Sequence, residues 1–430
     1  MSTRRRFNGE PIKNFKRRSF YGAKKVSSPI PARQNDTNVS LVTPQNVEVS
    51  IIMPSYNRYP LNLFSLYSLE NQTFDSSKME VIFIDDASTD ETQNELSNYR
   101  PVYHFKYIRS EQNLGRAKVR NLGIKSARGR ILIFLDAEMI CEPDFVENHY
   151  QHHQTSHKAI ITGVMHMKRI TSCSFPETSN DHLTNQKRRG SKKSTTLLEK
   201  NRPTPLLTKA DITNQSYKDS AVETDSWFKA ITQNFGDNLN DFQFPWMAFL
   251  TGNVSIPKDL IEAAGMFDEE FVKFGYEDWE LGYRLYKMGA QYFVKDNLVT
   301  YHQEHPIGES KWREAMENLH LFISKHRDVD VLMLGLEAAR FTDLLTLNKI
   351  VKEYKQLMKK EEFRNFQEKF ISILEAIALL LRIDVRHFNV LGAMGYGSNQ
   401  KSELVKDINL IKRQKHYPNL SKLLSKILNS

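Results

Sequence analysis

The stretch ILIFLDAEMI, residues 131–140, contains five consecutive apolar residues that end at Asp136, and a second acid follows at Glu138. A short run of bulky apolar residues is typical of a strand that is buried on both faces of a parallel sheet. Side chains of an extended segment alternate between its two sides, so Asp136 and Glu138 are expected to point the same way. Two carboxylates placed together can hold a hard divalent cation such as Mg²⁺ or Mn²⁺. The stretch therefore predicts a strand with a metal-binding pair at its end.

The segments around this strand alternate between strand-like and helix-like patterns. Runs rich in Val, Ile and Phe are followed by segments with apolar residues at helical spacing. Such alternation is typical of an α/β fold in which helices flank a mostly parallel sheet. We expect strands at 47–54, 79–88, 102–109, 130–135 and 158–167, and helices at 60–71, 90–98, 115–127 and 143–154.

The second half of the chain begins with a polar segment. Residues 168–245 are rich in Ser, Thr, Asn, Lys and Asp, which predicts an insertion or an active-site lid. Hydrophobic periodicity then returns in the helical pattern and dominates the C-terminal region. We expect a helix at 276–289, strands at 291–295 and 298–302, and helices throughout 307–430.

Positive charge is concentrated at the N-terminus. The formal net charge is +9, from 60 Lys and Arg against 51 Asp and Glu. Residues 1–25 hold nine basic residues and a single acid, Glu10, so the rest of the chain is close to neutral. We expect a basic disordered tail at 1–46, a main domain at 47–306 and a helical region at 307–430. A charge confined to a tail argues against nucleic-acid binding by the fold.

The composition favours a cytoplasmic protein. Its two cysteines form no disulfide framework, and no apolar segment typical of a signal peptide follows the basic N-terminus. The most apolar window, 370–383, is too short to span a membrane and contains Glu375. The tail could contact the anionic inner face of a membrane, and the C-terminal helices could form a homodimer. A solvated arm and helices packed on the main domain are the plainer alternatives.

Polar clusters follow each of the first four expected strands. Open parallel sheets bind ligands beyond the carboxyl ends of their strands. A single acid there is often a helix N-cap, and Asp90 fits that role. Asp85 with Asp86, and Asp136 with Glu138, exceed what capping requires. The clusters are PSYNR (54–58), IDDASTDET (84–92), SEQNLGRAKVRNLG (110–123) and LDAEM (135–139).

In combination these motifs resemble a known enzyme family. VSIIMPSYNR, VIFIDDASTDET and NLGRAKVRNLGIKSARGRILIFLDAE are similar to the N-terminal half of family 2 glycosyltransferases of GT-A fold. GNVSIPKDLIEAAGMFDEEFVKFGYEDWELGYRLYKMG is similar to the C-terminal half of galactosyltransferase-type and polypeptide N-acetylgalactosaminyltransferase-type enzymes and of bacterial chondroitin-type synthases. The resemblance covers about 48–305. It implies a GT-A domain at 47–306, with a Rossmann-like, mixed and mostly parallel sheet.

The resemblance also implies a reaction and a donor pocket. The reaction is the inverting transfer of a hexose or N-acetylhexosamine from a UDP-sugar, assisted by Mn²⁺ or Mg²⁺. Asp86 would face the uracil, and Gly252 and Asn253 would lie beside the donor sugar. The residues implied to bind the nucleotide sugar are Pro54, Tyr56, Arg58, Asp86, Asn113, Gly115, Arg116, Arg120, Asp136, Gly252 and Asn253.

The metal site implied by the resemblance carries one departure from the family pattern. Asp136 and Glu138 match the family's metal-binding Asp-x-Asp motif, with Glu at the third place. Glutamate is still an oxygen ligand but is one methylene longer. His302 would complete the site from the last strand, with His305 as the alternative.

The acceptor side is implied by GYEDWELGYRL, residues 275–285. Acids at the start of a helix are favourable for their placement alone. The resemblance implies more: Asp278 as the general base, and Glu277 bonded to hydroxyls of the acceptor or donor. A carboxylate within hydrogen-bond reach of an acceptor hydroxyl can remove its proton. Trp246 and Trp279 could stack on a sugar, although core packing explains Trp279 equally well.

Two other functions are compatible with parts of the sequence. A non-catalytic sugar-nucleotide or glycan-binding module would be expected to lack the metal and base acids, which are present. A nucleotidyltransferase would carry a Gly-rich loop after the first strand, but PSYNR has no glycine. The Gln-x-x-Arg-Trp motif of processive synthases is absent. The acceptor stays open between a glycan, a teichoic-acid-like chain and a peptide.

Overall fold

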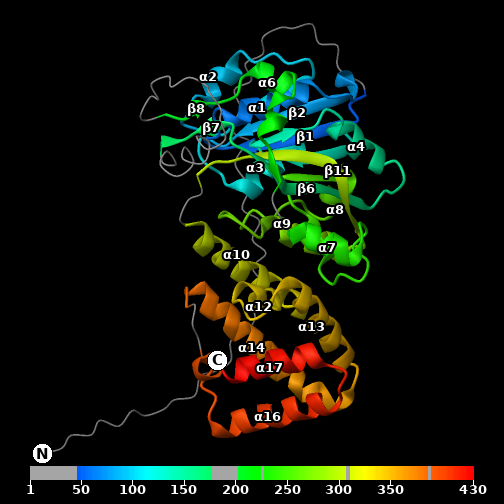
Figure 1. Ribbon diagram of the computed structural model, residues 1–430, viewed down its shortest axis with the longest axis vertical. Helices are drawn as coiled ribbons and strands as arrows, with labels where there is room; N and C mark the ends of the chain where they lie inside the picture. The colour runs from blue at the N-terminus through cyan, green and yellow to red at the C-terminus, as the bar shows by residue number, and fades with distance from the viewer. Residues whose placement is uncertain (1–45, 177–201, 224–226, 307–309, 386–388) are drawn as a thin grey trace, which may run out of the picture. The chain divides into compact units, whose positions relative to one another are not determined.

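The structure is a computed structural model that describes residues 46–176, 202–223, 227–306, 310–385 and 389–430 (Figure 1). The predicted basic tail and the QKRRGSKK segment at 186–193 lie outside the described residues. Within the described part of the chain, no helix is both long and apolar enough to cross a membrane.

A mixed sheet forms the centre of the main domain, as predicted. β1, β2, β3 and β4 are parallel neighbours, and β6 and β11 also pair in parallel. The strands of the sheet run in the order β3 (His104–Arg109), β2 (Met79–Asp85), β1 (Val49–Ser55), β4 (Ile131–Leu135), β10 (Asn253–Pro257), β6 (Ala159–Ile170), β11 (Gln291–Gln303) and β5 (Met139–Cys141), and β9 (Val222–Glu223) pairs with β6.

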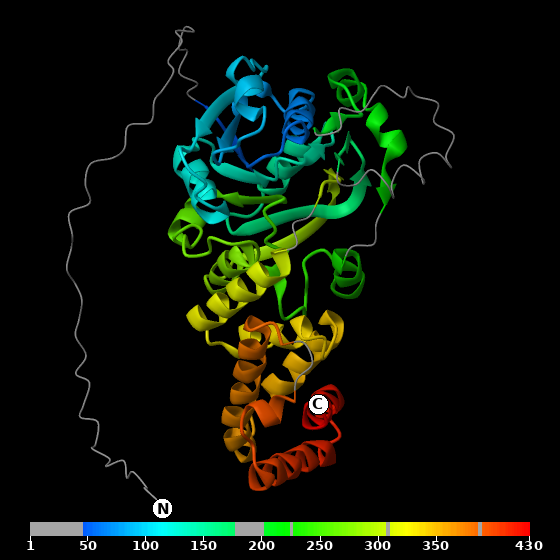
Figure 2. The same ribbon diagram turned by 90° about the vertical axis from the view of Figure 1, so that its left-hand side faces the viewer.

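Helices cover both faces of this sheet because the central strands are apolar on both sides (Figure 2). Ile52 of β1 joins the core cluster that includes α3 (Arg116–Ser126), whereas its neighbours Ile51 and Met53 join the cluster that includes α1 (Leu61–Glu70). Successive side chains of a strand point to opposite faces, so one strand supplies both cores. The expected α/β architecture is confirmed.

Four strands of this sheet were missed or predicted differently. β5, β9 and β10 were not predicted, because β5 and β9 have only three and two residues and β10 is a five-residue segment directly before the helix that begins at Lys258. The strands expected at 291–295 and 298–302 form the single strand β11, whose pairing with β6 shifts register between Lys295 and Val299. Asp296 and Asn297 are exposed at that irregularity, which explains the polar break in the sequence.

The antiparallel direction of β10 shapes the site. The first residue of β10, Asn253, pairs with Leu135, the last residue of β4. The preceding Gly252 therefore lies at the same edge of the sheet as Asp136, although the two residues are far apart in the sequence. Thus the edge at which the parallel strands end also receives the loop from the second half of the domain.

Helix α9 (Glu277–Lys287) is held close to the η4 turn (Pro245–Ala248) by a glycine. A Cβ atom at Gly282 would lie 2.4 Å from the carbonyl oxygen of Trp246 and 2.9 Å from Cβ of Phe249. Real Cβ contacts are longer than this, so only glycine permits the observed distance. The close packing fixes the helix that begins with Glu277 and Asp278.

Replacing Gly282 by Ala is expected to lower the free energy of unfolding by roughly 1–3 kcal/mol, because the added methyl overpacks the contact. Gly335→Ala in α12 (Leu334–Ala338) is a matched control, since its nearest neighbour would be Cγ2 of Ile377 at 3.7 Å. That control is expected to leave the free energy of unfolding unchanged or to raise it by up to about 1 kcal/mol, because Ala has a higher helix propensity than Gly. Urea unfolding of both variants measures the difference, and equal stabilities would contradict the close-packing argument.

The C-terminal region is helical, as expected. Its core is continuous with that of the main domain: the same cluster of buried residues contains Phe134 of β4, Leu281 of α9, Leu374 and Leu424. Homodimer formation through these helices stays a prediction. The larger helices of the region are α10 (Lys311–Lys325), α13 (Leu344–Leu357), α14 (Arg364–Arg382), α16 (Ser398–Arg413) and α17 (Pro418–Leu428).

Candidate active site

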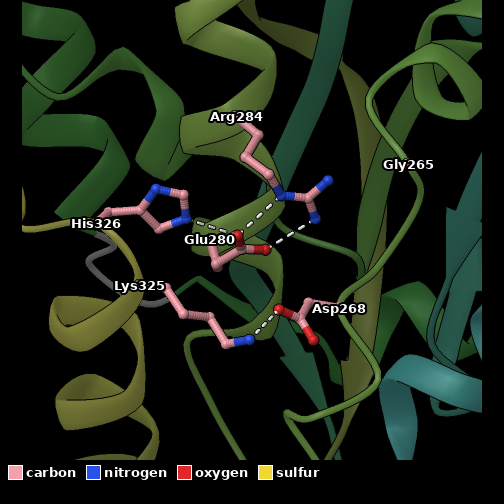
Figure 3. A pocket seen from close by; sticks show the side chains of 6 residues that line it. All are labelled: Gly265, Asp268, Glu280, Arg284, Lys325 and His326. Carbon is pink, nitrogen blue, oxygen red and sulfur yellow. Dashed lines mark hydrogen bonds and ion pairs between the residues drawn. The ribbon is translucent and has the colours of Figure 1, made fainter. Parts of the chain in front are cut away.

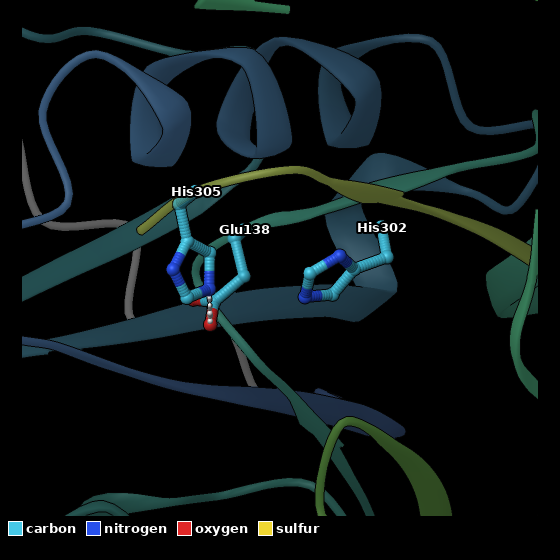
Figure 4. A group of neighbouring side chains, drawn as sticks. All are labelled: Glu138, His302 and His305. Atoms are coloured by element: carbon cyan, nitrogen blue, oxygen red, sulfur yellow. Dashed lines mark ion pairs between the residues drawn. The ribbon is translucent and has the colours of Figure 1, made fainter. Parts of the chain in front are cut away.

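Glu138, His302 and His305 form a compact group of potential metal ligands (Figure 4). One ligand atom from each lies within 4.8 Å of the others, and Nε2 of His305 is 3.3 Å from Oε1 of Glu138. Strand pairing brings them together, because His302 of β11 is the partner of Met139 in β5. The sequence left the choice between His302 and His305 open, and the structure places both beside Glu138.

The Glu138 carboxylate is held in its ionised form. Burial opposes ionisation, yet the hydrogen bond from His305 and the charge of Arg58 hold the pKa of Glu138 well below its usual range. Nε of Arg58 lies 3.3 Å from Oε2 of Glu138. One carboxylate and two imidazoles suit a divalent transition metal such as Mn²⁺, whereas Mg²⁺ prefers oxygen ligands. The donor set fits Mn²⁺, one of the two cations that the sequence left open.

Asp136 is positioned differently from Glu138. It is not part of the group of mutually close ligand atoms, and its Oδ1 lies 3.4 Å from Nη2 of Arg120. Arg120 is 1% exposed, and its Nη1 lies 3.0 Å from Oε1 of Glu277. Arg120 therefore bridges the end of β4 and the start of α9. The predicted metal role of Asp136 and nucleotide role of Arg120 stay predictions.

Asp278 is the second residue of α9 and follows Glu277, which is 3% exposed. Burial, followed by the charge of Glu277, raises the pKa of Asp278 to about 7, although Arg120 acts in the opposite direction. One oxygen of Asp278 accepts the backbone N–H of Trp279 at 2.8 Å. A carboxyl group with a pKa near neutrality can both take up and release a proton under ordinary conditions.

Asp86 organises the loop that carries Asn113. Its carboxylate accepts the backbone N–H of Leu114 at 2.7 Å and that of Gly115 at 3.1 Å. Gly115 has a φ of +85°, and a Cβ there would lie 2.9 Å from the carbonyl oxygen of Val272, so the turn requires glycine. In the structure Asp86 thus shapes the loop, while the side chain of Asn113 is exposed beyond it.

The first strand delivers three of the predicted residues to the same edge. Pro54 is half-buried near the end of β1, Tyr56 is 45% exposed, and Arg58 contacts Glu138. Tyr56 follows β1 directly, and its exposed ring is available to a flat ligand such as a nucleobase. The placement agrees with, but does not test, a nucleotide-binding role.

Asn253 has a structural role that the sequence did not indicate. Its side chain is fully buried, donates to the carbonyl oxygen of Leu298 at 2.8 Å and contacts Nε2 of His149 at 3.0 Å. The side chain of Asn253 is thus engaged within the fold, and its place beside the donor sugar stays a prediction. Gly252, one residue earlier, is also buried at the sheet edge.

The aromatic residues near Asp278 form a connected group. Trp246 is fully buried and packs edge-on against Trp279, so its predicted stacking on a sugar is replaced by core packing. Trp279 is half-buried and also contacts Trp227, which is 38% exposed at the start of α7 (Trp227–Phe235). The insertion thus contributes an exposed aromatic ring to the neighbourhood of Asp278.

A cavity of about 460 Å³ lies between α9 and the end of α10 (Figure 3). Within it Arg284 and His326 both bond Glu280, which is 1% exposed, and Lys325 pairs with Asp268. These contacts pair the charges of the cavity with one another and join the two helices. We interpret the cavity as a structural junction, and it contains none of the predicted site residues.

Sequence motifs did not point to Lys311, the first residue of α10. It belongs to an amphipathic helical segment with no catalytic signature, so only the three-dimensional structure relates it to the site. Its Nζ lies 4.8 Å from the ring centre of Phe274, and the guanidinium of Arg116 lies 4.8 Å from the same ring.

Comparison with known families agrees with this geometry. Residues 50–208, which contain β1 without Val49, β2 to β4 and both acids of the ILIFLDAEMI stretch, match the family model described as glycosyl transferase family 2. This match covers less than half of the chain and makes that part of it similar to family 2 glycosyltransferases. The observed mixed sheet and flanking helices are those expected for the GT-A fold of this family.

Proteins of different length are similar to this chain. It is 29% identical to the uncharacterized glycosyltransferase YfnE of Bacillus subtilis, over 77% of this chain and 84% of that protein. It is 27% identical to chondroitin synthase of Pasteurella multocida, over 66% of this chain but only 28% of the synthase. A crystal structure of S. aureus TarS is similar, with a TM-score of 0.45 and 16% identity, over 88% of this chain and 55% of TarS. The resemblance of the C-terminal half to galactosyltransferase-type enzymes stays a prediction.

Proposed function

We propose that this glycosyltransferase is inverting and metal-dependent, and that it transfers a hexose or N-acetylhexosamine from a UDP-sugar. The observation that supports this most is the arrangement of two distinct groups around one buried arginine. Arg120 contacts Asp136 at the end of β4 and Glu277 at the start of α9. The ligand group of Glu138 begins two residues after Asp136, and Asp278 follows Glu277 directly. Arg120 would thus connect the group that binds the departing UDP with the group that contains the general base.

The proposed reaction requires different protonation behaviour of Glu138 and Asp278. Glu138 is held ionised, as a metal ligand must be, whereas Asp278 has a pKa raised to about 7, as suits a general base. Asp278 would take the proton of the acceptor hydroxyl. The oxygen of that hydroxyl would attack the anomeric carbon while UDP departs from the opposite face. A divalent cation bound by Glu138, His302 and His305 would neutralise the negative charge of the departing diphosphate.

We propose a glycan as the acceptor. Chondroitin synthase, one of the relatives, acts on a glycan by its name, and Trp227 and Trp279 offer aromatic surface near Asp278. Aromatic faces are suited to the apolar faces of sugars. A teichoic-acid-like chain and a peptide remain in the panel of acceptors to be tested.

The decisive experiment is UDP release from a panel of UDP-sugars with each acceptor class, in the presence of Mn²⁺, Mg²⁺ or EDTA. We expect turnover with one UDP-hexose or UDP-N-acetylhexosamine, faster with Mn²⁺ than with Mg²⁺, and abolished by EDTA. Turnover that survives EDTA would contradict the metal dependence. Product with retained anomeric configuration, read by NMR, would contradict the inverting mechanism.

A further inference from the structure

Two cations, Lys311 and Arg116, share one aromatic ring, that of Phe274. Nζ of Lys311 and the guanidinium carbon of Arg116 each lie 4.8 Å from the ring centre of Phe274. Lys311 begins α10, Arg116 begins α3, and Phe274 precedes α9, so three separate elements meet there. All three side chains are half-buried. An aromatic ring attracts cations but leaves their charge uncompensated.

The nearby acids in the described part of the chain are already engaged by other groups. Glu138 is paired with Arg58 and Asp136 with Arg120. Glu314, the acid on α10 nearest in sequence, accepts the hydroxyl of Ser310 at 2.6 Å and the backbone N–H of Phe274 at 3.2 Å. Among the described residues, the side chains of Lys311 and Arg116 contact Phe274 and form no ion pair or hydrogen bond. Their charges are therefore available to a ligand.

The electrostatic environment links Lys311 to the metal-ligand group. Burial, followed by the charges of Arg116 and Arg58, lowers the pKa of Lys311, while Glu138 and Asp136 act in the opposite direction. The charge of Lys311 thus interacts with both arginines and with both acids of the predicted metal motif. Three cations at one edge of the sheet favour a ligand with more than one negative charge.

We propose that Lys311 and Arg116 bind the diphosphate of the donor nucleotide and of the UDP product. The proposal rests on the proposed function and extends it, since it assigns the first residue of the C-terminal helical region to the donor site. Arginine binds phosphate oxygens through a planar fork of donors, and lysine through a compact charge. The ligand chemistry is a diphosphate, and the nucleoside would bind elsewhere, toward Tyr56 and Asp86.

The test compares UDP with uridine, because only UDP carries the diphosphate. Calorimetry on the full chain with Mn²⁺ is expected to show UDP binding weakened by about 10- to 100-fold in Lys311→Met, the range for loss of one charged hydrogen bond. Uridine affinity should not change. Arg313→Met is the matched control, since Arg313 is exposed on the same helix and carries the same charge. It should bind UDP like the original chain.

Arg116→Met provides a second variant in case Lys311→Met is unstable, and it is expected to weaken UDP binding over the same range. Equal UDP affinity in Lys311→Met, Arg313→Met and the original chain would overturn the proposal. So would an equal loss of UDP and uridine binding in Lys311→Met, which indicates a structural role. If the original chain binds no UDP at all, the proposed donor itself is wrong, and this outcome is distinct from the other two.

Discussion

Replacement of Asp278 by Asn is expected to lower kcat by about 10²- to 10⁴-fold, the usual contribution of a positioned general base. The amide has nearly the shape of the carboxylate but cannot take up a proton. Its oxygen can still accept the N–H of Trp279, which the carboxylate accepts at 2.8 Å. UDP affinity should therefore be unchanged, so the loss appears in turnover and not in donor binding.

Asp259→Asn is the control for this substitution. Asp259 is exposed on α8 (Lys258–Ala263), and its carboxylate accepts the backbone N–H of the following residue, Leu260, also at 2.8 Å. It matches the local bonding of Asp278 but is not next to Glu277 or Arg120. We expect full activity in Asp259→Asn. Undiminished turnover in Asp278→Asn would refute its role as the base.

The pH dependence follows from the same carboxyl group. Its pKa is raised to about 7, so at lower pH most of the enzyme carries the protonated, inactive form. We expect kcat/KM to rise tenfold per pH unit below about 7 and to level off above it, while the enzyme stays folded. A flat profile between pH 5 and 8 would show that another group takes the proton.

As the pH rises, the contribution of Asp278 to stability should fall while its contribution to activity rises. A carboxyl group with a raised folded-state pKa binds protons more tightly in the folded than in the unfolded chain, so its ionisation lowers stability as pH rises from about 4 to 7. Asn carries no such charge beside Glu277. Asp278→Asn is therefore expected to be more stable than the original chain at pH 8, by roughly 1–2 kcal/mol, and no more stable near pH 4. Thermal unfolding at both pH values measures this.

The sequence predicted the sheet well because its signals are local. Strands such as Ile131–Leu135 are apolar throughout and end in polar clusters, and this pattern depends on neighbouring residues alone. β10 and β5 were missed because a short strand is stabilised by its partners: β5 exists through its pairing with β11, more than 150 residues later. The order of strands brought Gly252 to the end of β4, which no local pattern indicates.

Sequence motifs identified candidate residues of the site. They could not predict which contacts those residues make in the folded chain. Asp86 and Asn253 also bond within the fold, to the loop at Leu114 and to the helix residue His149, which no motif indicated, and their expected places at the ligand stay predictions. Lys311 was missed because a lysine at the start of an amphipathic helix is ordinary. Its position over Phe274 depends on the packing of α10 and is not encoded in any short motif.

Replacement of Glu138 by Ala is expected to abolish Mn²⁺ binding in the micromolar range and to lower activity by at least about 100-fold. The metal would lose its carboxylate ligand, and such an ion contributes several kcal/mol to the stabilisation of a departing charged group. Arg58 would also lose the partner that lies 3.3 Å away, which adds a positive charge at the place of the cation. Mn²⁺ titration followed by electron paramagnetic resonance measures binding without relying on turnover.

Substitutions of the two histidines test whether the metal binds at the group around Glu138. His302→Ala and His305→Ala are each expected to weaken Mn²⁺ binding, because both imidazoles lie in the group around Glu138. His152→Ala, which removes a histidine bonded to Asn297 instead, should have no effect.

Asp136→Asn should weaken Mn²⁺ less than Glu138→Ala does, since Asp136 is held by Arg120 outside that group. The reverse order would show that the metal lies at Asp136, as the family motif alone implies. In that case the longer Glu138 would serve to orient Arg58 and His305 and would not bind the cation.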